Sequence, residues 1–138
     1  MMNLVEKLLR TDAKKVDELS EAVIASKKLG KALGEESVDV KIRELPAKRM
    51  NDLMAMQFDG KGNFSLKKNF DVKALVVAEA MVEPDLKSKE LQEHFNCSTS
   101  KDLAIKLFGN ELTMLSDEVA KLSGMEESVE EIDDEVKN

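Results

Sequence analysis

The sequence has little of the residue types that usually carry chemistry or rigid packing. Among its 138 residues there is no Trp or Tyr, and there are only one Cys, one His and two Pro. A single Cys excludes an intramolecular disulfide and a zinc site built from several cysteines. Without Trp and Tyr, the core must consist of aliphatic side chains supplemented from five Phe and eight Met. We therefore expect an aliphatic, Met-rich fold in a reducing compartment.

Long apolar runs are also missing. The longest uninterrupted one covers residues 74–78, far short of the roughly twenty residues that cross a bilayer. Charged residues interrupt the first ten positions, so these do not form the apolar region of a signal peptide. Together these features predict a cytoplasmic protein that does not bind a membrane.

Charge is concentrated at one end of the chain. Of the net charge of −7, most comes from residues 125–138, which carry seven carboxylates and one Lys. We predict an N-terminal helical segment at residues 1–35, a folded domain at 36–124 and a disordered acidic tail at 125–138. Elsewhere basic and acidic residues are mixed and no aromatic residues are interleaved for base stacking, so nucleic acid is not an expected partner.

Apolar periodicity predicts a predominantly helical α+β fold. One helix is expected over residues 12–33, with Gly30 weakening or ending it. A second helix, over residues 72–82, is apolar almost all round, so it should lie at the centre of the fold with several short helices around it. Further helices are predicted from Pro46 onward and over residues 89–95, 101–108 and 110–123.

One segment changes period. Over residues 37–43 apolar and charged side chains alternate strictly, which predicts a half-buried strand. A single strand leaves its backbone groups unpaired. It must therefore pair with a weak strand near residues 63–70, or with a second copy of the chain. In the second case the small β element is intermolecular and residues 37–43 form a homo-oligomer contact.

Candidate catalytic and metal-binding groups have simpler explanations. His94 and Cys97 are close in sequence, but a nucleophilic pair needs a third orienting group and zinc needs three or four ligands. The loop from Asp59 to Asn63 places Lys61 where a calcium site needs an oxygen ligand, so an exposed turn is expected. We therefore predict no catalytic residue, no cofactor and no metal ligand, and we do not expect an enzyme.

An adaptable apolar surface is the remaining candidate site. Met side chains are flexible and suit varied apolar partners, although core filling is the alternative explanation. A helix or a strand of a partner could dock on such a surface. The candidate partner-binding residues are Val38, Val40, Ile42, Met50, Leu53, Met54 and Met56.

Three short motifs occur in a characteristic order. An apolar helix ends in Val-x-Pro-Asp at residues 82–85, a helix start of the form Thr/Ser-x-x-Asp/Glu-Leu follows at 99–103, and Leu-Ser-Gly closes the last helix at 122–124. Over residues 36–124 this order resembles the XkdN-like tail assembly chaperones of Gram-positive phages, prophages and phage-tail-like particles.

The resemblance implies a non-enzymatic chaperone in the cytoplasm of a bacterial host cell. Such a chaperone binds the tape-measure protein and keeps it soluble until the tail tube is assembled around it, and the tail tube protein is a second candidate partner. The alternative is a structural head–tail or tail-tube-associated component retained in the particle. A small regulatory adaptor is a third, weaker alternative.

Overall fold

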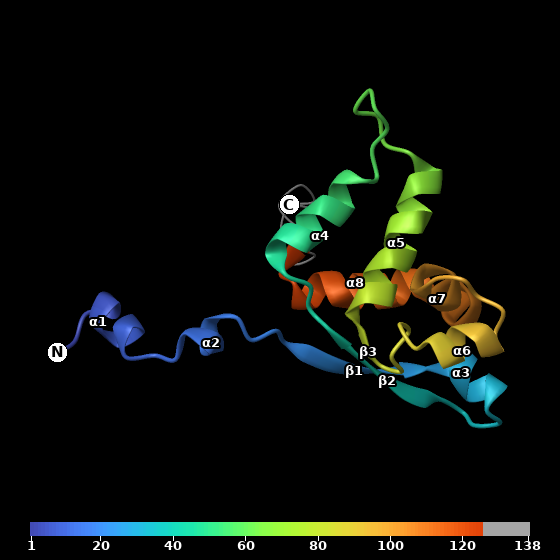
Figure 1. Ribbon diagram of the computed structural model, residues 1–138, viewed down its shortest axis with the longest axis horizontal. Helices are drawn as coiled ribbons and strands as arrows, with labels where there is room; N and C mark the ends of the chain where they lie inside the picture. The colour runs from blue at the N-terminus through green and yellow to red at the C-terminus, as the bar shows by residue number, and fades with distance from the viewer. Residues whose placement is uncertain (126–138) are drawn as a thin grey trace, which may run out of the picture.

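The computed structural model of the protein describes residues 1–125, so almost all of the predicted acidic tail lies outside the described residues. Helices predominate and accompany one small sheet (Figure 1). The helices are α1 (Leu4–Leu9), α2 (Ala13–Val16), α3 (Lys27–Ala32), α4 (Ala47–Ala55), α5 (Leu66–Ala80), α6 (Lys89–His94), α7 (Ser100–Phe108), the 3₁₀ helix η1 (Gly109–Glu111) and α8 (Leu112–Leu122). The strands are β1 (Glu21–Ser26), β2 (Val38–Arg43) and β3 (Met81–Glu83). The predicted α+β, mostly helical class is confirmed.

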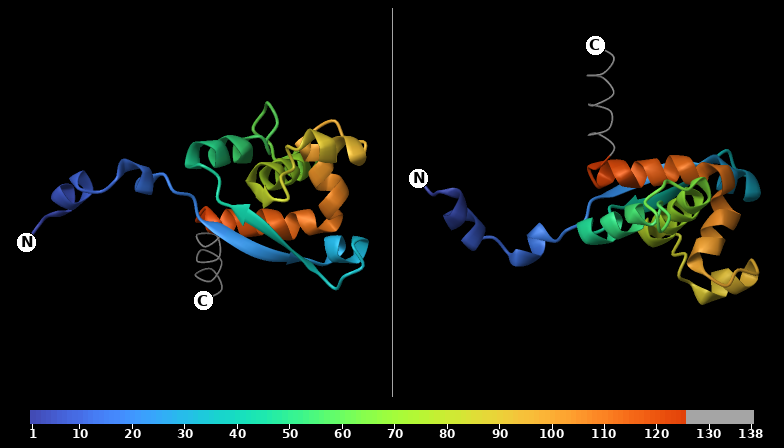
Figure 2. Two further views of the ribbon diagram at one scale, coloured as in Figure 1. Left: turned by 60° about the horizontal axis from the view of Figure 1, so that its bottom comes forward. Right: turned by 90° about the horizontal axis from the view of Figure 1, so that it is seen from above.

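Within residues 1–125 the main helices lie on one face of the sheet (Figure 2). Helix α5 packs against α7 and α8, and α8 also contacts β1 and β2. The segment that carries α1 and α2 extends away from this body along the direction of β1 (Figures 1 and 2). None of the described helices is long and apolar enough to cross a membrane.

Helix α5 supplies the centre of the core, as its composition predicts. Six of its residues are buried, from Val72 to Ala80. The helix begins at Leu66, earlier than expected, because the Ser65 hydroxyl accepts a hydrogen bond from the Lys68 N–H at 3.3 Å and caps it. It also ends at Ala80, because the next three residues leave the helix and pair with β2.

The sheet is antiparallel with the order β1-β2-β3, so β2 is its central strand. The strand predicted at residues 37–43 is confirmed. The expectation that its partner lies near residues 63–70 or in a second copy is wrong, because β1 pairs with it from Glu21↔Arg43 to Ser26↔Val38. The homo-oligomer contact expected through residues 37–43 therefore loses its basis.

The helix predicted over residues 12–33 is also wrong. That stretch contains α2, β1 and α3. In β1 alternate side chains turn toward the core while Glu21, Val23 and Ala25 are exposed, which is the period of a strand. Consequently β1 and α3, which precede residue 36, belong to the same sheet and core as β2.

Side-chain caps start the short helices α6 and α7. The Ser88 hydroxyl accepts from the Leu91 N–H at 3.2 Å at the start of α6, and the Thr99 hydroxyl accepts from the Asp102 N–H at 3.1 Å at the start of α7. Each bond satisfies a backbone donor that has no partner within its helix. Local capping rules thus locate these helices to within a residue or two.

Candidate functional site

The seven residues predicted to bind a partner divide by burial. Four have at most 2% of their surface exposed and lie in the core: Val40, Ile42, Met50 and Leu53. They are core residues because β2 turns alternate side chains inward and α4 turns its i, i+3 pair inward. Val38 and Met54 are half-buried, whereas Met56 is 47% exposed. In this fold only the last three can contact a partner.

Met56 belongs to a larger exposed apolar surface between α4 and α5, which we call the α4–α5 patch. Its members have between 46% and 56% of their surface exposed: Met56, Phe58 and Phe64. Two of the five phenylalanines of the chain are therefore at the surface beside each other. Large aromatic side chains gathered on a surface are typical of a site that contacts another molecule.

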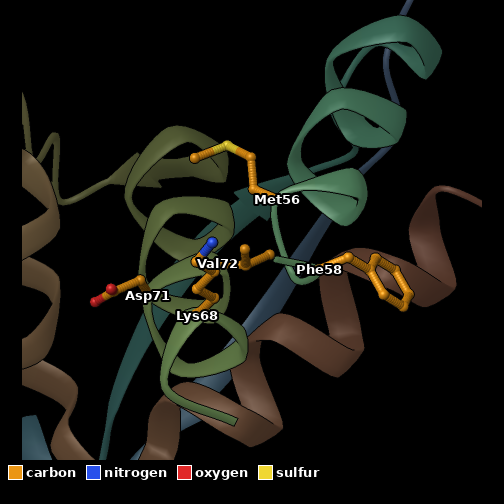
Figure 3. A pocket seen from close by; sticks show the side chains of 5 residues that line it. All are labelled: Met56, Phe58, Lys68, Asp71 and Val72. Carbon is orange, nitrogen blue, oxygen red and sulfur yellow. The ribbon is translucent and has the colours of Figure 1, made fainter. Parts of the chain in front are cut away.

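A shallow cavity of about 370 Å³ lies at this patch (Figure 3). Met56 and Phe58 line it from the end of α4, and Lys68, Asp71 and Val72 line it from α5. Val72 is buried, and Lys68 and Asp71 add one charge of each sign to the lining. The cavity therefore offers apolar contact with one charge of each sign beside it.

The loop that displays Phe58 and Phe64 is held by its own hydrogen bonds. The Asp59 N–H donates to the Asn63 carbonyl at 2.8 Å, and the Gly62 N–H donates to the Asp59 carbonyl at 3.0 Å. Gly62 has a φ of +84°, a conformation that glycine adopts without strain. The two rings meet edge to face with centroids 6.2 Å apart. The predicted exposed turn is thus an ordered hairpin loop.

Polar contacts also fix the patch to the body. The Gln57 carbonyl accepts from the Ser65 N–H at 2.9 Å, and the Gln57 side-chain oxygen accepts from the Asn69 amide at 2.6 Å. Arg49 donates to both carboxylate oxygens of Glu79 at 2.7 and 2.6 Å, which joins α4 to α5. These polar contacts therefore hold the loop, α4 and α5, which carry the apolar side chains, in a fixed arrangement.

Asp59 gives the loop a dependence on pH. Hydrogen bonds from the backbone of Asn63, then of Lys61, lower the pKa of the Asp59 carboxyl. Because the folded pKa is depressed, the stabilisation is complete above the ordinary pKa of aspartate and is lost as pH falls through the folded pKa. In an NMR titration we expect the Lys61 and Asn63 amides to shift with a midpoint below that ordinary pKa, and Asp59→Asn to abolish the transition. A midpoint at or above the ordinary value would contradict this prediction.

A second apolar surface, which we call the α3–α7 groove, lies on another part of the body. It encloses about 340 Å³. Its lining residues are Lys28, Leu29, Ala32, Leu33, Pro84, Leu91, Phe95, Lys106 and Leu107. The Lys28 ammonium donates to the Lys106 carbonyl at 2.9 Å, so it stays at the edge of the groove.

Glu111 fixes α3 beside α7 and so shapes this groove. Its carboxylate accepts from the Ser26 hydroxyl at 2.6 Å and from the Lys27 N–H at 3.0 Å. These bonds satisfy groups at the start of α3. The role of the Glu111 side chain is therefore to position the short helix α3.

His94 and Cys97 both contact Phe95. The Cys97 thiol lies 3.6 Å from the Phe95 carbonyl, and the His94 ring packs edge to face on Phe95 with centroids 4.9 Å apart. Within residues 1–125, no three His, Cys, Asp or Glu side chains gather where they could hold a metal ion.

Sequence reasoning missed the aromatic members of the α4–α5 patch. Phe58 and Phe64 flank a turn-rich loop, and such loops lie at the surface. Aromatic residues placed where the chain must be exposed were the available signal, and they mark a contact surface more directly than the methionines do.

The fold and these surfaces define a class: a small α+β protein with exposed apolar surfaces on elements that hydrogen bonds hold in place. The chain belongs to the phage XkdN-like tail assembly chaperone family, whose sequence profile matches residues 5–137. This finding confirms the resemblance seen over residues 36–124 and extends it into the N-terminal segment. No curated protein sequence matches the chain.

One solved structure is similar in fold. It is the crystal structure of the protein YqbN, at 15% sequence identity and a TM-score of 0.53. The similarity covers 78% of this chain and 88% of YqbN. At this identity the likeness concerns the fold alone.

Proposed function

We propose that the protein binds the tape-measure protein of a phage-type tail and keeps it soluble in the host cytoplasm while the tail tube assembles. Membership of the tail assembly chaperone family carries the proposal. A holding function requires accessible apolar surface, and the α4–α5 patch supplies it with Phe58, Phe64 and Met56. The tail tube protein is a further proposed partner, because it must replace the chaperone on the same client.

The α4–α5 patch suits a helical apolar client. Phe58 and Phe64 form a rigid aromatic pair, whereas Met56 and the half-buried Met54 can adjust to side chains of different shape. An amphipathic helix presents apolar side chains at i, i+3, i+4 and i+7, and it can lay them on such a surface. The patch thus combines fixed anchors with adaptable contacts.

Replacing both aromatic anchors tests the site. We expect Phe58→Ser combined with Phe64→Ser to weaken binding of a tape-measure fragment by about tenfold or more, because exposed aromatic anchors carry most of the energy of such contacts. The fold should remain intact, since both rings are largely exposed. Binding is measured by calorimetry, and client solubility by co-expression with the downstream tape-measure gene followed by sedimentation.

Leu33→Ser is the matched control. Leu33 is 66% exposed but lines the α3–α7 groove. Loss of binding in this variant alone would assign the client to the groove. If the unsubstituted chain leaves the fragment as insoluble as it is alone, the holding function is wrong.

The alternative is a structural component retained in the particle. A holding chaperone leaves when the tube encloses its client, so purified mature particles should contain none of this protein. Stoichiometric recovery of the chain from such particles would favour the structural alternative.

A further inference from the structure

The two edges of the sheet are built differently. The β3 edge is only three residues long, its register with β2 is irregular, and Pro84 follows it. Short length, irregular pairing and proline all protect an edge from pairing with another chain. The β1 edge has none of these protections, because its six residues pair regularly with β2 and residues 22–26 carry neither charge nor proline.

The hydrogen-bond pattern shows which backbone groups of β1 are open. The Glu44 N–H donates to the Ser20 carbonyl at 2.8 Å, in register with the β1–β2 ladder. Bonded and non-bonded pairs alternate in an antiparallel ladder. The N–H and C=O groups of Glu21, Val23 and Ala25 therefore point away from β2, to the side where no strand of the described chain lies.

We propose that two copies of this protein associate by antiparallel pairing of their β1 edges about a twofold axis at Val23. The pairing places Val23 opposite the partner's Val23, and Glu21 opposite the partner's Ala25. Every outward backbone group of β1 then gains a partner, and the two sheets join into one. This inference goes beyond the proposed chaperone function and does not depend on the client.

Charge favours a second copy over an unrelated strand. β1 begins with Glu21 and leads directly into Lys27 and Lys28. In the antiparallel pair the Glu21 carboxylate lies diagonally from the partner's Lys27, within reach of long side chains. The same contact occurs twice because the axis is twofold. The edge is thus complementary to itself.

The N-terminal segment supports the same arrangement. It leaves β1 at Glu21 and runs away from its own body (Figure 2). In the antiparallel pair this direction leads past α3 of the partner. All residues of α1 are exposed, and four of them are large and apolar: Leu4, Val5, Leu8 and Leu9. The pairing brings this uncovered stripe toward a second body, where it can be buried.

Disulfide trapping tests the axis directly. Facing residues of a hydrogen-bonded pair have Cα atoms about 5.5 Å apart, which a disulfide can bridge. In a chain carrying Cys97→Ser, we expect Val23→Cys to form a covalent dimer on mild oxidation. Asp39→Cys is the control, because Asp39 is also exposed but lies on the central strand. Equal and slow cross-linking of both variants would overturn the proposal.

A charge exchange at the axis supplies an independent measurement. Val23→Lys and Val23→Glu each place like charges directly opposite, so each should weaken dimerisation about fivefold or more by light scattering. An equimolar mixture of the two should regain association. Unchanged circular dichroism confirms that both variants fold.

Two results would refute self-pairing. One is a chain that remains monomeric at every concentration. The other is a monomeric chain in which Val23→Lys abolishes client binding. That result would show that a strand of the client, and not a second copy, pairs with the β1 edge.

Discussion

Phe108→Ala is expected to lower the free energy of unfolding by about 3–5 kcal/mol. Phe108 ends α7, is fully buried and is the largest of the fully buried side chains. Its removal leaves a cavity between elements that cannot close fully. A domain of this size has a total stability of roughly 5–15 kcal/mol, so the variant should be marginal. Because the chain lacks Trp and Tyr, denaturant unfolding is best followed by far-ultraviolet circular dichroism.

Phe64→Ala provides the matched control. It removes the same atoms from a side chain that is 56% exposed. The stability should change by no more than about 0.5 kcal/mol. Equal effects of the two substitutions would contradict the placement of Phe108 in the core.

Gly30→Ala should destabilise the protein by about 2 kcal/mol. A β-carbon at Gly30 would lie 2.4 Å from Cα and 2.7 Å from N of Ser37. Both atoms belong to the backbone, so the start of β2 or the whole of α3 must move. Alanine favours a helix over glycine by about 1 kcal/mol, which does not offset so close an approach. Thermal unfolding of both proteins measures the difference.

Gly60→Ala is the control for the glycine effect. No atom lies within 4 Å of the position of its β-carbon. We expect a change within about 0.5 kcal/mol. If Gly30→Ala raised the melting temperature instead, the close approach of α3 to Ser37 would be wrong.

The sheet shows which strands a sequence can reveal. β2 is evident because Val38, Val40 and Ile42 alternate with charged residues. β1 is hidden because its inward and outward positions are both occupied by small or apolar residues, so no contrast marks the period. β1 also continues into α3 without a turn. The boundary is marked by the Ser26 hydroxyl, which accepts from the Leu29 N–H at 3.2 Å and caps α3.

The boundaries of α5 illustrate a second limit. Leu66 and Phe70 near its start are both exposed, so the buried face of the helix does not extend to the true start. Its end is hidden because β3 continues the apolar composition of the helix over three residues. Long-range pairing with β2, rather than local preference, decides that these residues become a strand.

The candidate site was predictable only in part. Methionine clustering directed attention to the end of α4, but Met50 turns inward and Met56 outward, and this distinction depends on how α4 packs on α5. The aromatic half of the patch comes from the loop. Sequence distance alone does not show that Phe58 and Phe64 meet, because the path of the hairpin decides it.

The distribution of phenylalanine has a practical consequence. Phe58 and Phe64 lie in the α4–α5 patch, Phe70 is exposed on α5, Phe95 lines the α3–α7 groove and Phe108 is in the core. Fluorine placed on every ring would give a separate resonance for each of these environments. A titration with any candidate ligand would then report, from a single labelled sample, which face it occupies and whether the interior responds.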